Sequence, residues 1–282
     1  MNNGETPGEK RLKLTMLMEQ NKNNFTKSEH KLHRYILEHF EEVLYKSLTE
    51  ISSECKLGEA TILRFCRKLG LKGYQDFKFA LAQELSSLQK SNNDETYIDK
   101  IKGNMGQSIE DTYELLDADI LQQAIDEISH SNDVIVYGIS SSGIAGLDMK
   151  SRLMRIGKNI EVVTDSHNQV IRSCSVTNET VIIAISLTGS TKDIVDAVEE
   201  AKKNHATVVA ITNYVKSPLT KYSDLVLLSS AKENPLDSGS LVSKVSQLFV
   251  IDLLCTGIAM TQYERAQQNK ELIAGAISSK LY

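Results

Sequence analysis

The sequence predicts an all-helical domain followed by an α/β domain, in which a five-stranded parallel sheet lies between two layers of helices. Three observations lead to this fold class. Up to residue 89 the apolar residues follow a helical period. From about residue 109, short β-branched runs alternate with amphipathic segments, which is typical of a parallel sheet covered on both faces. A polar stretch rich in Ser, Asn, Lys and Asp separates the two patterns and indicates a linker that has room for a helical part.

Length and composition fit two soluble domains. With 282 residues, the chain has room for a domain over 1–89, a linker over 90–108 and a second domain over 109–282. The N-terminus has no apolar signal-peptide core, and the most apolar stretch, 248–260, is too short to span a membrane. The four cysteines lack the spacing of a metal site. We therefore expect a cytoplasmic protein with no metal, no cofactor and no membrane partner.

The helical domain begins with a short pattern near residues 12–20. Thr26 or Ser28 can cap the next helix, over which an apolar stripe runs from Leu32 to Phe40. A short helix from Thr49, a turn over 55–61 and a second helix ending at Gly70 then have the proportions of a helix-turn-helix. The apolar face of the second helix is formed by Ile62, Phe65, Cys66 and Leu69.

Charge supports a nucleic-acid interface at this motif. The whole chain carries a net charge of −5, yet residues 56–78 hold six basic and two acidic residues, a local balance of +4. The polar face of the second helix predicts contacts to base edges by Glu59, Ala60, Thr61 and Arg64. It predicts contacts near phosphates by Arg67, Lys68 and Lys72. Because Arg64 and Lys68 lie off the apolar stripe, their removal should leave the domain folded. An ordinary helical hairpin with a solvated basic face remains the alternative.

The second half contains five strand-like runs. They are expected over 133–138, 159–164, 180–186, 207–213 and 225–230. Helices should begin near Ser142, His167, Thr191 and Ser217, and a long final helix should run from about Ser240 to Arg265. That last helix is apolar on more than one face, so it should be buried in the core or in a subunit interface. In such sheets, ligands bind at the carboxyl ends of the strands.

One strand end has the chemistry of an anion site. The apolar run 183–185 ends in a loop that offers the hydroxyls of Ser186, Thr188, Ser190 and Thr191, and an amphipathic segment follows. Gly189 lets the backbone come close to a ligand. Hydroxyls together with free N–H groups at a helix N-terminus form a site that most often takes phosphate.

Two motifs in this order resemble a known family. Residues 48–51 followed by 60–78 (ATILRFCRKLGLKGYQDFK) resemble the N-terminal domain of RpiR/MurR-type transcriptional regulators, and the resemblance covers nearly the whole chain. That family joins a winged-helix-like DNA-binding domain to a SIS (sugar isomerase) domain, which senses a phosphosugar. One departure is Gly58, where the family usually has a serine that caps the recognition helix; glycine is a tolerable cap.

The resemblance implies which residues hold the sugar phosphate. Residues 138–143 resemble the SIS loop G-x-G-x-S, with Ser140 in place of the second glycine, Ser141 beside it and Ser142 at the ligand-contacting hydroxyl. Residues 186–191 match the second loop, S-x-[S/T]-G-x-T, which implies that Ser186, Thr188 and Thr191 contact phosphate. For 138–143 alone, a serine-rich turn is the alternative.

Two further positions are candidates for contacts to the sugar. The family often has a D-x-H segment where this chain has Asp165 and His167, so His167 can bind a sugar hydroxyl. Equally, Asp165 can cap the next helix and leave His167 on its first turn. Glu233 lies before the last helix, where SIS enzymes often carry a proton-transferring carboxylate. In a regulator, Glu233 would contact a sugar hydroxyl or be solvated.

These observations predict a DNA-binding transcriptional regulator without catalytic residues. Its expected partners are double-stranded operator DNA, a phosphorylated sugar effector and a second copy of the chain in a homodimer or larger homo-oligomer. The first alternative is an enzyme, a sugar-phosphate isomerase or an etherase-like lyase that uses the SIS pocket. A second alternative is a phosphosugar-binding protein that regulates a protein partner through its helical domain.

Overall fold

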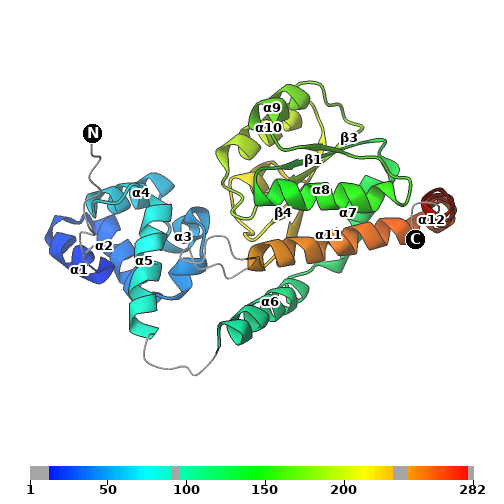
Figure 1. Ribbon diagram of the computed structural model, residues 1–282. Helices are drawn as coiled ribbons and strands as arrows, with labels where there is room; N and C mark the ends of the chain where they lie inside the picture. The colour runs from blue at the N-terminus through cyan, green and yellow to red at the C-terminus, as the bar shows by residue number, and fades with distance from the viewer. Residues whose placement is uncertain (1–12, 90–95, 231–240, 279–282) are drawn as a thin grey trace, which may run out of the picture. The chain divides into compact units, whose positions relative to one another are not determined.

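A computed structural model gives the architecture of the chain and describes residues 13–89, 96–230 and 241–278. These residues fall into two compact units, the first within 13–89 and the second comprising the rest (Figure 1). The two units are described separately below.

The described residues of the first unit are helical. Its elements are α1 (Leu14–Asn21), η1 (Lys22–Asn24), α2 (Lys27–Glu38), η2 (Glu42–Tyr45), α3 (Leu48–Cys55), α4 (Glu59–Lys68) and α5 (Tyr74–Gln89). The predicted cap of α2 is Thr26, which forms a reciprocal capping box with Glu29. Phe65 of α4 and Phe77 of α5 are fully buried and lie at the centre of the core.

The second unit contains the predicted five-stranded parallel sheet. Its strands are β1 (Asp133–Gly138), β2 (Glu161–Val163), β3 (Thr180–Ile185), β4 (Thr207–Thr212) and β5 (Leu225–Leu228), in the order β2-β1-β3-β4-β5. All pairs are parallel. The last residues of β1 and β3, Gly138 and Ile185, are partners in the register, so these two strands end side by side.

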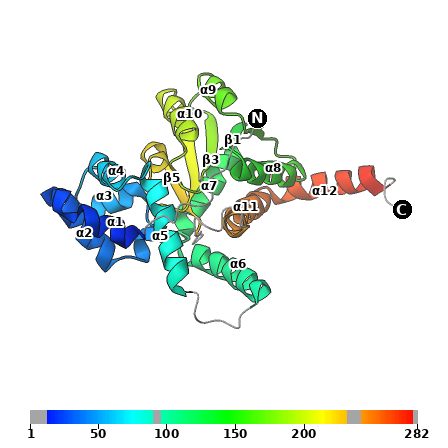
Figure 2. The same cartoon turned by 60° about the vertical axis from the view of Figure 1, so that its left-hand side comes forward.

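Helices cover both faces of this sheet (Figures 1 and 2). On one face lie α7 (Ala118–His130), α8 (Ser141–Met154) and α11 (Val242–Thr261), and on the other lie α9 (Ser166–Ser173) and α10 (Lys192–Lys203). Alternate side chains of β3 point to opposite faces, because Ile183 and Ile185 belong to the first core and Ile182 and Ala184 to the second. Burial on both faces explains the continuous apolar runs in the sequence.

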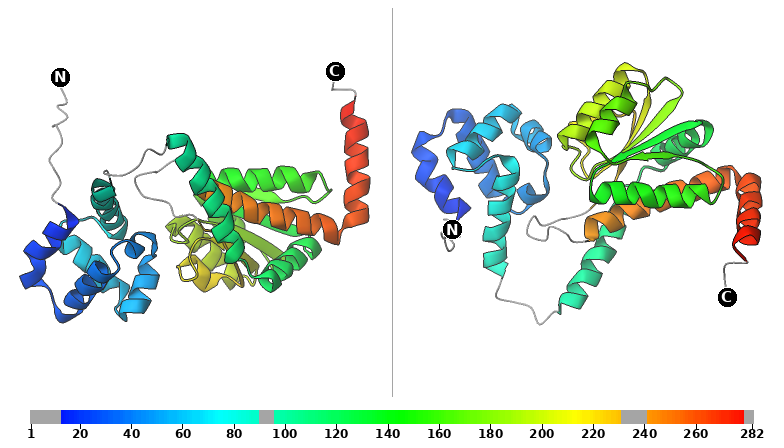
Figure 3. Two further views of the ribbon diagram at one scale, coloured as in Figure 1. Left: turned by 90° about the horizontal axis from the view of Figure 1, so that it is seen from below. Right: turned by 45° about the horizontal axis from the view of Figure 1, so that its top comes forward.

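Three segments differ from the sequence-based expectations. Residues 97–108, assigned from composition to a linker with room for a helical part, are helical throughout and belong to α6 (Tyr97–Glu114), which packs against the start of α11 (Figure 3). The helix expected from Ser217 is only a short 3-10 turn, η3 (Leu219–Tyr222). The expected single final helix is interrupted at Gln262, whose backbone leaves the helical region (φ −114°, ψ 40°), and α12 (Tyr263–Ser278) follows. The Gln262 side chain donates to the Ser129 carbonyl at 2.9 Å, and this contact accompanies the break.

Within the described residues, one helix, α11, is long and apolar enough to cross a membrane by length and composition alone. Its apolar side chains instead pack inside the second unit, where Val250, Ile251, Leu254 and Ile258 are fully buried. Helix α11 is therefore the core helix expected from its apolar character.

Candidate phosphosugar site and nucleic-acid interface

The loop between β1 and α8 brings a helix N-terminus close to a strand end. A Cβ on Gly138 would lie 2.8 Å from the backbone of Ser142, and one on Gly143 would lie 2.9 Å from the Gly138 carbonyl oxygen. Glycine is thus required at both positions by the close approach of backbone to backbone. No side chain caps α8, and its first turn contains no acidic residue, so its N–H groups are available to an anion.

Ser140 has a backbone conformation that favours glycine. Its φ is +55° and its ψ is −124°, although it carries a Cβ. This is the position where the SIS pattern has its second glycine, so the loop keeps the glycine geometry despite the substitution. Such a conformation costs about 1–3 kcal/mol and is typical of sites where function dictates the backbone. The Ser140 side chain is exposed.

The loop between β3 and α10 gathers the second group of hydroxyls. Ser186 is buried, and its Oγ lies 3.4 Å from Oγ1 of Thr191, the N-terminal flanking residue of α10. The Ser190 N–H donates to Thr188 Oγ1 at 3.2 Å. Thr191 makes no capping hydrogen bond, so the first turn of α10 also offers free N–H groups.

Gly189 makes the tight turn of this loop. Its φ is +58°, and a Cβ there would lie 2.7 Å from the Cβ of the buried Ser217. Its carbonyl accepts from the Leu219 N–H at 2.9 Å, which joins the loop to the segment after β4. No other residue type fits this position without displacing Ser217.

Because β1 and β3 end side by side, the structure brings loops 138–143 and 186–191 together at the carboxyl end of the sheet. We call these two loops the hydroxyl loops. His167 follows β2, which pairs with the other side of β1, and lies exposed on the first turn of α9. Asp165 caps that helix by accepting the Asn168 N–H at 2.9 Å, the simpler of the two roles considered for it. Glu233 lies outside the described residues.

Gln247 of α11 is a residue of this site that the sequence analysis did not identify. It is buried, and its Nε2 donates to Ser142 Oγ at 3.3 Å. With its oxygen accepting from Gln247, Ser142 keeps its own proton free to donate to an anion. The available signal was an amide within an otherwise apolar helix, which needs a polar partner when buried.

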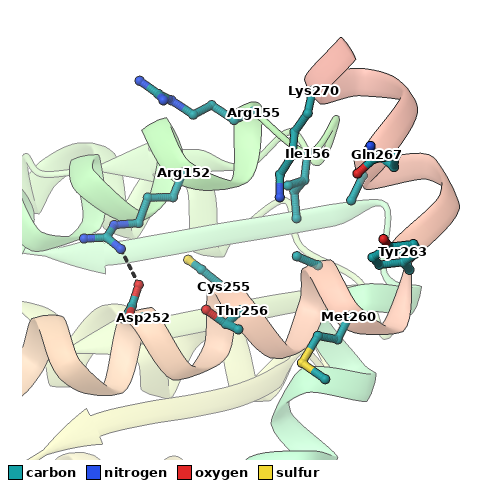
Figure 4. A pocket seen from close by; sticks show the side chains of 12 residues that line it. Arg152, Arg155, Ile156, Asp252, Cys255, Thr256, Met260, Tyr263, Gln267 and Lys270 are labelled. Atoms are coloured by element: carbon teal, nitrogen blue, oxygen red, sulfur yellow. Dashed lines mark hydrogen bonds and ion pairs between the residues drawn. The ribbon is translucent and has the colours of Figure 1, made fainter. Parts of the chain in front are cut away.

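A separate cavity of about 340 Å³ lies between α8, α11 and α12 (Figure 4). Arg152 crosses its rim to form an ion pair with Asp252, and Tyr263 and Lys270 line it from α12. None of the predicted phosphosugar residues lines this cavity. It is therefore distinct from the hydroxyl loops.

In the first unit, α3 and α4 form the predicted helix-turn-helix. Lys56 ends α3 with a left-handed backbone (φ +51°), and Gly58 precedes α4 without a side-chain cap, as its missing hydroxyl predicts. Ile62, Phe65 and Cys66 are buried, which matches the expected apolar face. Burial raises the pKa of the Cys66 thiol to about 12, so this cysteine is a neutral core residue.

The polar face of α4 carries most of the predicted DNA contacts. Ala60, Arg64, Arg67 and Lys68 of α4 are exposed, as is Lys72 in the loop that follows. Glu59 and Thr61 are half-buried and already bonded, because Thr49 Oγ1 donates to Glu59 Oε1 at 2.8 Å and Arg64 Nη2 donates to Thr61 Oγ1 at 3.3 Å.

Lys68 has an internal partner that its sequence position did not reveal. Its Nζ lies 2.7 Å from Glu29 Oε2 and donates to the Asn24 carbonyl at 2.9 Å. Burial alone would raise the pKa of Glu29, but the hydrogen bonds from Lys68 and Thr26 outweigh it and hold that pKa below its ordinary value. Lys68 was expected to be removable without unfolding the domain, and this geometry adds that its removal should lower the stability of the folded domain.

Fold and site together define a two-unit protein that joins a helix-turn-helix to a SIS-type sheet. Residues 12–88 match the family model of the helix-turn-helix domain of the rpiR family, and residues 127–257 match that of the SIS domain. An uncharacterised HTH-type transcriptional regulator of Clostridium perfringens is 36% identical over 92% of this chain and 97% of its own length. The chain belongs to the RpiR family of HTH-type transcriptional regulators.

Solved structures agree with this assignment. The Vibrio vulnificus NanR protein complexed with ManNAc-6P is 28% identical, with a TM-score of 0.85 over 96% of this chain and 99% of that one. The sugar isomerase domain of an RpiR transcription factor from Sphaerobacter thermophilus is 22% identical, with a TM-score of 0.59 over 64% of this chain and 98% of that one. The second likeness concerns the fold alone.

Proposed function

We propose that this regulator binds operator DNA through α4 and that a phosphorylated sugar bound at the two hydroxyl loops changes its affinity for DNA. The observation that carries the proposal is the pair of uncapped helix N-termini, those of α8 and α10, that follow the adjacent strands β1 and β3. Backbone N–H groups and hydroxyls together suit a phosphate dianion. The solved NanR complex with ManNAc-6P supports a sugar phosphate as the ligand class.

The proposed contacts to phosphate come from the two hydroxyl loops. In this proposal Ser142, Ser186, Thr188 and Thr191 donate their hydroxyl protons to phosphate oxygens, and the N–H groups of the two loops complete the anion site. Ser140, Ser141, Gly189 and Ser190 belong to the two loops, and we propose contacts to sugar hydroxyls for His167 and Glu233.

Binding of ligand to the native state should appear as a rise in melting temperature across a panel of hexose and amino-sugar phosphates. Ser186→Ala and Thr188→Ala should then each weaken binding of the active compound by about 1–2 kcal/mol in calorimetric titration. Ser223→Ala is the matched control, because this hydroxyl precedes β5 and therefore lies at the amino end of the parallel strands, away from the hydroxyl loops. Unchanged affinity in the double variant would refute the site.

DNA recognition is assigned to the exposed residues of α4 and the loop after it. Arg64→Ala should weaken operator binding by about 1–3 kcal/mol and relax the preference at one base position per half-site. Lys72→Ala should weaken all sequences equally and reduce the salt dependence by about one counterion. If both variants keep the operator affinity and the salt dependence of the wild type, the polar face of α4 does not contact DNA and is only solvated.

The assembly and location follow from the same proposal. We propose a cytoplasmic homodimer that reads two related half-sites, because each chain presents one recognition helix. Full operator affinity of a monomer in sedimentation would contradict the dimer. We further propose that the SIS unit acts without catalysis; turnover of any phosphosugar that it binds would favour the isomerase or etherase alternative.

A further inference from the structure

Helix α6 meets the rest of the second unit mainly through hydroxyl groups, and Met105 is its one half-buried large apolar side chain. Its only buried side chains are Ser108 and Thr112. Five other large apolar side chains of α6 are exposed: Tyr97, Ile98, Ile101, Ile109 and Tyr113. Attachment through a few hydrogen bonds is specific in geometry but weaker than burial of an apolar stripe.

The two hydroxyls bind the chain at the carboxyl edge of the sheet. Ser108 Oγ donates to the Ser230 carbonyl at 2.8 Å and lies 3.3 Å from the Val242 carbonyl oxygen. The Ser230 N–H donates to Thr112 Oγ1 at 2.9 Å, and that hydroxyl donates to the Ser108 carbonyl at 2.6 Å. We call this group the α6 clasp: Ser108 and Thr112 bound to Ser230, which follows β5, and to Val242, the first residue of α11.

The α6 clasp is linked to the hydroxyl loops through α11. Val242 begins this helix, and Gln247 on its second turn binds Ser142 in the loop after β1. A helix moves as a rigid element over so short a distance. A shift at Ser142 would therefore act on both α11 and the carbonyl that Ser108 contacts.

Helix α6 is also intrinsically weak. It contains Gly103 and Gly106, each of which lowers the stability of a helix interior. Packing does not require either glycine, because a Cβ at each position would meet no atom within 4 Å. A weak helix held by a small hydrogen-bonded group is suited to exist in two states, attached and released.

We propose that α6 transmits occupancy of the phosphosugar site to the segment that leads back to the DNA-binding unit, and that Ser108 and Thr112 are the positioning residues for this coupling. The proposal rests on the proposed function of the hydroxyl loops. Anion binding at Ser142 favours the attached state of α6. Loss of the α6 clasp uncouples α6 from the site while leaving the site able to bind.

Hydrogen exchange of the full chain tests this coupling. Amide exchange is measured in chloride, in inorganic phosphate at equal ionic strength and with N-acetylmannosamine 6-phosphate. In the wild type, phosphate should slow exchange both in residues 186–191 and in α6. Ser108→Ala with Thr112→Val should speed exchange in α6 by about tenfold without ligand, because the hydrogen bonds that join α6 to Ser230 are lost. The same variant should abolish the ligand-dependent slowing in α6 while residues 186–191 still respond.

The control is Glu110→Ala, which changes an exposed side chain of the same helix and should behave as wild type. Gly103→Ala with Gly106→Ala should slow exchange in α6 without ligand, by roughly fivefold per substitution, and should shrink the effect of ligand. If residues 186–191 respond to phosphate but α6 does not, or if α6 still responds in the Ser108/Thr112 variant, the coupling is refuted. If neither probe slows exchange in residues 186–191, the proposed phosphosugar site itself fails, and the coupling fails with it.

Discussion

Replacing Lys68 with alanine distinguishes an internal ion pair from a contact to DNA phosphate. The Lys68 Nζ lies 2.7 Å from Glu29 Oε2, and the Glu29 side chain is only 4% exposed, against 31% for Lys68. After the substitution, a nearly buried carboxylate keeps the N–H of Thr26 as a donor but loses its cation. The expected result is a less stable first unit.

The expected loss in the free energy of unfolding follows from the charged hydrogen bond between Lys68 and Glu29. A hydrogen bond to a charged group contributes about 1.5–3 kcal/mol, and water screens the partly exposed lysine. We therefore expect Lys68→Ala to lower the free energy of unfolding of this unit by about 2 kcal/mol. Urea titration followed by hydrogen exchange in peptides from α2 and α4 would report on this unit alone.

Lys72→Ala is the matched control, because Lys72 is exposed in the loop that follows α4. A double-mutant cycle with Glu29→Gln should give a coupling energy of about 1 kcal/mol or more for the pair. If Lys68→Ala is as stable as Lys72→Ala and loses DNA affinity, Lys68 is free to contact phosphate and the reasoning from the ion pair is wrong.

The same pair predicts a dependence on pH. The pKa of Glu29 lies below its ordinary value of 4.5 in the folded unit. A carboxyl group with a lowered pKa stabilises the fold above its unfolded pKa, and this stability disappears as pH falls through the folded value. The difference in stability between wild type and Lys68→Ala should therefore be full near neutral pH and should shrink below about pH 4. A difference that grows in acid would contradict this sign.

Three further variants test the second unit. Ser140→Gly should raise its free energy of unfolding by about 1 kcal/mol in urea titration, because glycine relieves the positive φ; a loss of stability would show that Ser140 is not strained. Gly189→Ala should cost about 2–4 kcal/mol in the same titration, and Ser217→Gly should partly restore stability by removing the clash. Gln247→Leu should weaken phosphosugar binding about tenfold in calorimetry without unfolding the unit; wild-type affinity would show that Gln247 does not orient Ser142.

The sheet and the helix-turn-helix could be predicted because local pattern determines them. Continuous apolar runs such as 180–185 identify buried parallel strands, whereas the strand order that places β1 beside β3 comes from the structure. Thr26 was a recognisable cap because Glu29 stands three residues later.

The rest depends on contacts between residues distant in sequence. Lys68 and Glu29 are 39 positions apart, and Ser142 and Gln247 are 105 apart, so no local pattern indicates either pair. The bounds of helix α6 could not be predicted over 97–108, because its glycines and polar residues have the composition of a linker. Its buried side chains, Ser108 and Thr112, lie in its C-terminal half, and their partners Ser230 and Val242 are more than 100 positions away in sequence.

The position of α11 near the end of the chain has a consequence for biosynthesis. The apolar core of the first unit is formed by described residues within 13–89, whereas the core of the second needs α11, which packs on α6, α7 and α8 and ends at Thr261. Domains fold as units during synthesis, N-terminal first, and short-range helical contacts form fastest. We therefore expect the helix-turn-helix to be complete on the ribosome well before the sheet closes. A nascent or truncated chain could then bind DNA at a stage when no sugar phosphate can yet change its affinity for DNA.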